Sequence, residues 1–226
     1  MMKRALPFLL LASAAGAQTP VNAGASPATI AANKALADSL NWEDRQDFDF
    51  ASRGFLGSLK DPVIRDAAGN VVRDLREEAQ FTGPAPATVN PSLWRNATLL
   101  AGHGLFQVAD GIWQVRGFDL ANMTVIRGKT GWIIVDPLTT TEGARAAMAL
   151  VTEKLGKRPV TGVIYTHSHV DHFGGALSVV SQEDAASGKV PVIAPEGFVE
   201  HAVSENLIAG PAMLRRATYM FGAVLP

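Results

Sequence analysis

The stretch Thr166-His167-Ser168-His169-Val170-Asp171-His172 carries the strongest chemical signal in the chain. It holds three of the five histidines of the sequence, together with one carboxylate. Imidazole is the commonest metal-ligating side chain, and imidazole with carboxylate suits zinc and similar ions. On an extended backbone His167 and His169 would point to one side, because side chains alternate along a strand. Asp171 and His172 would follow just beyond, near a second metal position, so these four residues predict a metal site.

The residues on either side of this motif place it at the end of a strand. Residues 160–165 form a short apolar run that predicts a buried strand. Phe173-Gly174-Gly175 is expected to begin a helix, and its glycines allow close approach of the backbone. Open α/β sheets place their sites at the carboxyl ends of strands. The alternative is a polar turn whose histidines only make hydrogen bonds. We favour the metal site, because three imidazoles beside one carboxylate serve no evident structural need.

Working outward, the chain alternates between strand and helix patterns. Short β-prone runs separated by tight, glycine-containing turns predict an antiparallel meander. Beyond it, strands and helices alternate, which indicates mixed α/β layers. The expected strands are residues 105–108, 112–115, 123–126, 132–135, 160–165 and 190–193, and the expected helices are residues 141–155, 196–206 and 211–221.

The amino-terminal residues 1–17 have the pattern of a cleaved export signal. Met1-Met2-Lys3-Arg4 is basic, residues 5–14 are apolar, and Ala15-Gly16-Ala17 matches the small-residue cleavage pattern. The apolar run is shorter than the ~20 residues of a membrane-spanning helix. We therefore expect a periplasmic or secreted protein without a membrane span.

The rest of the chain divides into two predicted parts. Residues 18–91 are expected to form an amino-terminal extension that contains a hairpin at residues 63–72. The extension ends in a proline-rich linker at residues 81–91. Residues 92–226 are expected to belong to the catalytic domain.

Composition excludes several classes of protein. The 226 residues include 20 basic and 21 acidic side chains, which argues against a nucleic-acid partner. The chain has no cysteine, so it offers neither a thiolate nucleophile nor a thiolate metal site. Its chemistry must use imidazole, carboxylate and hydroxyl groups, or a metal ion that they hold.

The motif at residues 166–172 resembles the His-x-His-x-Asp-His signature of the metallo-β-lactamase superfamily. That resemblance implies an αββα sandwich and a two-metal hydrolase, most often with zinc. The signature is strong for the superfamily and weak for the substrate, because lactamases, lactonases, thioesterases and phosphodiesterases share it.

Flanking stretches resemble the alkylsulfatases of this superfamily, which are secreted or periplasmic enzymes that hydrolyse dodecyl sulfate and related esters. The resemblance extends from about residue 45 to residue 226. The similar stretches are residues 89–95, 117–124, 131–138, 194–198, 200–206 and 215–220.

The resemblance implies two zinc ions, the first held by His167 and His169 and the second by Asp171 and His172. It also implies a small alkyl sulfate substrate and a homodimeric complete enzyme. Its further ligands follow later in the family's sequence, so the expected fold is the amino-terminal half of the sandwich. One departure is residues 176–178, where the family pattern predicts an arginine-containing turn. With two donors for each ion, this chain alone is expected to bind zinc weakly and to associate.

Asp136, at the end of the strand 132–135, is expected either to support a metal ligand or to be a plain turn residue before Pro137. His103, His201 and Arg215-Arg216 are interpreted as loop or surface residues. Two alternatives to an alkylsulfatase stay open. One is another hydrolase of the superfamily, such as a β-lactamase, lactonase or phosphodiesterase. The other is a catalytically incomplete fragment that keeps only the metal loop.

Overall fold

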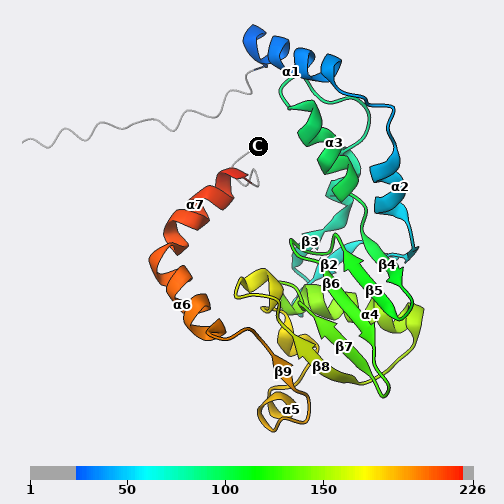
Figure 1. The fold of residues 1–226 in the computed structure, drawn as a ribbon, viewed down its shortest axis with the longest axis vertical. Helices are drawn as coiled ribbons and strands as arrows, with labels where there is room; N and C mark the ends of the chain where they lie inside the picture. The colour runs from blue at the N-terminus through cyan, green and yellow to red at the C-terminus, as the bar shows by residue number, and fades with distance from the viewer. Residues whose placement is uncertain (1–23, 221–226) are drawn as a thin grey trace, which may run out of the picture.

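A seven-stranded sheet forms the centre of the computed structural model, which describes residues 24–220 (Figure 1). The strands β4 to β7 pair antiparallel as the predicted meander, whereas β7, β8 and β9 pair parallel. The predicted export signal, residues 1–17, lies outside the described residues. In spatial order the strands are β1 (Phe55–Gly57), β4 (Gly104–Ala109), β5 (Ile112–Arg116), β6 (Met123–Arg127), β7 (Trp132–Val135), β8 (Val160–Ile164) and β9 (Val192–Ile193).

The core lies between this sheet and the helix α4 (Thr141–Leu155). Every second residue of β5, β6 and β7 is buried, as a strand with one covered face requires. The helix contributes buried side chains at helical spacing, and the Thr140 hydroxyl caps it by accepting the Gly143 N–H at 3.0 Å. The shared cluster includes Trp113, Met123, Val125, Trp132, Ile134, Ala144, Ala147, Leu150 and Val151. A sheet with a helix on one face is part of the predicted sandwich.

Apart from β1, the described residues before β4 form three α-helices and a hairpin at one end of the sheet (Figure 1). The third of these helices begins at residue 91, where the predicted extension ends. The predicted hairpin is confirmed, because β2 pairs antiparallel with β3. The sequence suggested a short helix within residues 30–40, where α1 lies, and a helix after Pro91, where α3 lies. It showed no clear period over α2, which buries no residue. The elements are α1 (Pro27–Ser39), α2 (Gln46–Ser52), β2 (Val63–Arg65), β3 (Val71–Asp74), the 3₁₀ segment η1 (Leu75–Gln80) and α3 (Pro91–Leu100).

After β8 the chain forms a loop, and the prediction that an α-helix begins at residues 173–175 is wrong. Two 3₁₀ turns occupy this region, η2 (Val170–His172) and η3 (Ala176–Ser178). Gly174 and Gly175 instead pack against the backbone that follows β7. A Cβ built on Gly174 would lie 2.2 Å from the Thr139 carbonyl oxygen, and one on Gly175 would lie 2.2 Å from that of Pro137. This contact between two loops takes the place of a helix start.

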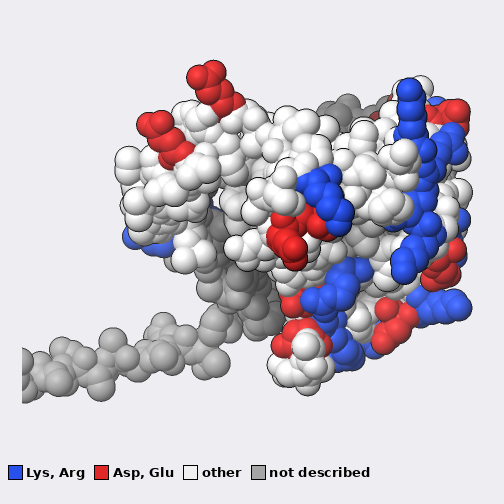
Figure 2. Space-filling view, turned by 90° about the horizontal axis from the view of Figure 1, so that it is seen from below, with Lys and Arg blue, Asp and Glu red and all other residues white. Residues whose placement is uncertain are grey.

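The last described elements form an arm beside the sheet (Figure 1). After the short α5 (Gln182–Ala186) and β9 come α6 (Phe198–Ile208) and α7 (Gly210–Met220), and α6 has no buried residue. Figure 2 shows that the arm presents mainly uncharged side chains on the face seen there. In residues 24–220 no helix combines the length and the apolar character that crossing a membrane requires.

Replacing Gly175 with alanine should destabilise the fold. Gly175 has an ordinary φ of −82°, so the penalty comes from crowding alone. Its new Cβ would meet two carbonyl oxygens and the Ala144 Cβ, at 2.2 to 2.8 Å. We expect urea unfolding to show a loss of about 1–3 kcal/mol. Gly162→Ala in β8 is the matched control, since its Cβ would meet nothing closer than 3.9 Å. Equal stability of both variants would show that the two loops can move apart freely.

Candidate metal centre

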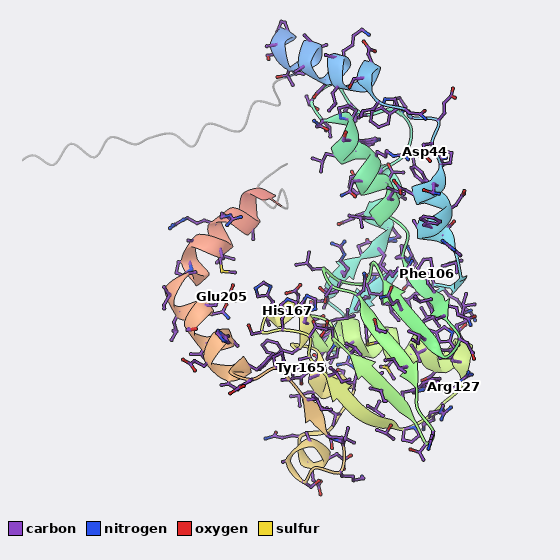
Figure 3. All side chains as sticks on the ribbon, viewed as in Figure 1. Asp44, Phe106, Arg127, Tyr165, His167 and Glu205 are labelled. Atoms are coloured by element: carbon purple, nitrogen blue, oxygen red, sulfur yellow. The ribbon has the colours of Figure 1, made fainter. Side chains whose placement is uncertain are left out.

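The predicted metal loop begins where β8 ends, beside the end of β7. Because these two strands are parallel, their carboxyl ends lie at one edge of the sheet. Asp136 follows β7, and residues 166–172 follow β8. Figure 3 shows His167 in this loop, between the sheet and the arm formed by α6 and α7. The topology therefore brings the two sequence-predicted positions together.

Asp136 ties the two strand ends to each other. Among the residues whose burial the structure describes, Asp136 is the one charged residue that is buried, with 7% of its surface exposed. One carboxylate oxygen, Oδ1, accepts the Thr166 N–H at 2.8 Å, and Oδ2 accepts the Thr166 hydroxyl at 2.6 Å. Its φ of +54° is left-handed, a conformation that aspartate tolerates better than most residues. Asp136 therefore holds the start of the metal loop, and the plain-turn interpretation of this residue is too simple.

The same carboxylate orients His172. Its Nδ1 lies 2.8 Å from Asp136 Oδ2, and a carboxylate can only accept, so Nδ1 carries the proton. In a neutral imidazole Nε2 then bears a lone pair, and it lies 3.2 Å from Asp171 Oδ2. Two acceptors at this distance need a proton or a cation between them. Two ligands of one tetrahedral zinc ion are about 3.3 Å apart, which is close to this separation.

Thr166 extends the network to His167. The threonine hydroxyl gives its single hydrogen to Asp136, so towards His167 Nδ1, at 2.9 Å, it can only accept. His167 Nδ1 therefore carries the proton, and Nε2 is left with its lone pair. One buried carboxylate thus selects the same tautomer in two of the three imidazoles, directly in His172 and through Thr166 in His167.

The third imidazole, His169, has a different partner. Its Nε2 lies 3.2 Å from Oε1 of Glu205, which belongs to α6. The three rings are neighbours, because the centroid of His167 lies 4.6 Å from that of His169 and 4.0 Å from that of His172. Burial raises the pKa of the Tyr165 hydroxyl, which lies directly before this loop, above its usual range.

The histidines and the carboxylate of the loop are side chains of the type that bind zinc, but their contacts with one another and with Asp136 and Glu205 are pairwise. Within residues 24–220 no group of three or more His, Cys, Asp or Glu side chains is placed to hold a metal ion. Imidazole nitrogens and a carboxylate are nevertheless the donors that zinc takes, and the fixed tautomers of His167 and His172 leave Nε2 available. The assignment of His167, His169, Asp171 and His172 as ligands stays a prediction.

Other candidates from the sequence lie elsewhere. His103 Nδ1 is 2.6 Å from the Ser58 hydroxyl, in agreement with a structural loop residue. His201, Arg215 and Arg216 are exposed on the arm. A groove of about 1150 Å³ opens beside η1 and α3, and its lining includes Arg116, Phe118, Leu120 and Thr139 but none of the four predicted ligands.

Sequence reasoning missed the parts played by Thr166 and Glu205. Thr166 was quoted as part of the motif, but its role depends on Asp136, 30 residues earlier. Glu205 follows His169 by 36 residues on a separate helix, and no spacing rule connects the two.

Comparisons with known proteins identify the family to which the chain is similar. Residues 116–216 match the model of the metallo-beta-lactamase superfamily. A linear primary-alkylsulfatase of Pseudomonas sp. is 49% identical over 204 residues, which are 89% of this chain and 30% of that protein. An alkyl/aryl-sulfatase of Saccharomyces cerevisiae is 48% identical over 200 residues, 88% of this chain and 31% of that protein.

A solved structure also matches the fold. It is the stereoselective inverting sec-alkylsulfatase of Pseudomonas sp., with a TM-score of 0.81 and 46% sequence identity. The match covers 87% of this chain and 31% of that one, so the chain spans about a third of its relatives' length. The fold and the loop are those of part of a metallo-β-lactamase domain. The chain belongs to the metallo-β-lactamase superfamily and, within it, to the alkylsulfatase family, as the sequence predicted.

Replacing Asp136 with asparagine should weaken the fold through hydrogen bonding alone, because asparagine also tolerates a left-handed φ. The amide nitrogen cannot accept, so one of the N–H or O–H groups now facing the carboxylate loses its partner. We expect a loss of about 1–3 kcal/mol in urea unfolding. Asp110→Asn is the control, since its carboxylate is 93% exposed and forms a surface ion pair with Arg127 at 3.0 Å. An unchanged midpoint for Asp136→Asn would show that the network contributes no stability.

Proposed function

We propose that this chain is the metal-loop part of a zinc-dependent hydrolase of alkyl sulfate esters. One observation carries the proposal. The buried carboxylate of Asp136 fixes the Nδ1 proton of His172 directly and that of His167 through Thr166. In both neutral rings Nε2 is therefore unprotonated, and its lone pair can bind a metal ion. Supporting carboxylates of this kind orient the histidine ligands of metal sites. The substrate class comes from the names of the alkylsulfatase relatives.

Each residue of the loop has a proposed part. His167 and His169 would hold a first ion, and Asp171 and His172 would hold a second. Asp136 and Thr166 would act through the histidines, because they keep the rings in the right tautomer before any ion arrives. When bound, zinc would supply Lewis acidity and a water whose pKa falls to about 7.

A second candidate rests on the pairing of donors. Catalytic zinc sites take three protein ligands and a water, whereas among the described residues no three His, Cys, Asp or Glu side chains are placed to hold one ion. This favours a chain that by itself binds zinc weakly and does not turn over ester. The two candidates differ in whether donors from outside these residues complete the site.

The test uses the double variant His167→Ala/His169→Ala, compared with His201→Ala. We expect the zinc affinity of the purified chain to fall by more than the roughly 10- to 100-fold that loss of a supporting residue costs. His201 is exposed on α6, so His201→Ala should retain the affinity of the unmodified chain. Zinc content after dialysis and competition with a fluorescent chelator measure both. A double variant with unchanged affinity would show that the two histidines are structural.

Substrate assays on the natural protein that contains this chain separate the members of the superfamily. We expect it to release sulfate from dodecyl sulfate and to leave a chromogenic cephalosporin intact. Cleavage of the cephalosporin alone would overturn the alkylsulfatase assignment. Sulfate release that the His167→Ala/His169→Ala variant retains in full would overturn the role of the loop.

A further inference from the structure

Helix α6 is anchored to the metal loop by an aromatic cluster. The ring of Phe198, the first residue of α6, lies 5.4 Å from that of Tyr165 and 5.1 Å from that of Phe173, centroid to centroid. Tyr165 immediately precedes Thr166, and Phe173 immediately follows His172. The cluster therefore joins both ends of the loop to the start of the helix, and Figure 3 shows Tyr165 at this junction.

Two helical turns further on, the same face of α6 carries Glu205. Seven residues separate Phe198 from Glu205, so their side chains leave the helix on one side. Glu205 faces the metal loop, and its Oε1 lies 3.2 Å from His169 Nε2 (Figure 3). Other side chains of α6 point away from the body, as the 71% exposure of Val199 and the 77% exposure of Leu207 show. The helix is thus attached along the face that includes Glu205.

The contact decides which nitrogen of His169 carries the proton. A carboxylate only accepts hydrogen bonds, so the ring nitrogen that faces Glu205 is the N–H in the neutral imidazole. Within the described residues His169 Nδ1 has no hydrogen-bond partner, so no contact there requires a proton on Nδ1. A neutral ring with its proton on Nε2 therefore fits the contact with Glu205. His167 and His172 have the opposite arrangement, with Nδ1 as the N–H group.

We propose that Glu205 is a positioning residue of the metal centre, which acts through His169. By accepting the Nε2–H group it leaves Nδ1 as the metal donor of this ring, whereas His167 and His172 bind through Nε2. This inference rests on the proposed function, since it assumes that the loop binds a metal. It also gives α6 a part in the site, because the aromatic anchor at Phe198 sets where the Glu205 carboxylate lies.

A different arrangement would place Glu205 on the metal together with His169 Nε2. The contrast with Asp171 argues against it. Asp171 faces Nε2 of His172, and the proton of that ring lies on Nδ1, where it is donated to Asp136. Glu205 faces Nε2 of His169, which can carry the proton of its own ring.

The test reads the tautomer of His169 directly. Nitrogen-15 spectra of the histidine side chains, recorded on the metal-free chain at about pH 8.5, distinguish a protonated from an unprotonated ring nitrogen. The spectrum of His169→Ala identifies the signals of His169. We expect Nε2–H in the unmodified chain and a mixture of tautomers in Glu205→Ala. Glu205→Gln should restore Nε2–H, because the amide oxygen also accepts. Glu200→Gln, an exposed change on the same helix, is the matched control and should alter nothing.

Zinc affinity provides the second readout. We expect Glu205→Ala to weaken zinc binding by about 10- to 100-fold, the usual cost of losing such a support. Glu205→Gln should cost less than Glu205→Ala. Stability is a poor substitute, because the pair is half exposed and such pairs contribute little to the fold.

The outcomes separate this inference from the proposed function. If the natural protein that contains this chain binds no zinc, the proposed function is overturned and, with it, the role of Glu205. Zinc binding with His169 protonated at Nδ1 overturns the inference alone. So does a Glu205→Ala variant with unchanged tautomer and affinity. Equal losses in Glu205→Gln and Glu205→Ala, with zinc on His169 Nε2, would show that Glu205 is a ligand.

Discussion

The carboxylate of Asp136 is the interaction on which the metal loop depends. It is buried, and it accepts hydrogen bonds from the Thr166 backbone, the Thr166 hydroxyl and His172 Nδ1. A buried charge is costly unless such donors surround it, so the carboxylate and the loop require each other. The protons that satisfy Asp136 also set the tautomers of His167 and His172. Structural need and the proposed metal chemistry are therefore met by one set of hydrogen bonds.

Two features of the backbone keep that carboxylate in place. The parallel pairing of β7 and β8 brings Asp136 and the start of the metal loop to the same edge of the sheet. Beyond the loop, the Gly175 N–H donates to the Leu138 carbonyl at 2.8 Å, which closes the segment against the turn after β7. Asp136 and Leu138 both have left-handed φ angles, of +54° and +65°. Residues held in such conformations persist where the surroundings fix them, and here they lie under the proposed site.

Helix α6 adds a second support from the opposite side. Its aromatic anchor lies on the residues that flank the loop, and its carboxylate Glu205 meets His169, the histidine of the loop that Asp136 does not reach. Two carboxylates from different parts of the chain thus hold the three imidazoles. The sheet and the arm each contribute one of them.

Local sequence was enough to predict the meander, helix α4 and the position of the histidine motif directly after β8. Their signals are the alternation of buried and exposed side chains in strands, the helical spacing of apolar residues, and a dense histidine motif. Each of these can be read from residues close together in the sequence. The helix expected at residues 173–175 failed because Gly174 and Gly175 pack against carbonyls of residues 139 and 137, a contact no local pattern records. The proton assignments of the histidines needed the fold as well. Asp136 and Glu205 lie 36 residues from His172 and His169 respectively, and only the packing of strand ends and of α6 brings these atoms within hydrogen-bonding distance.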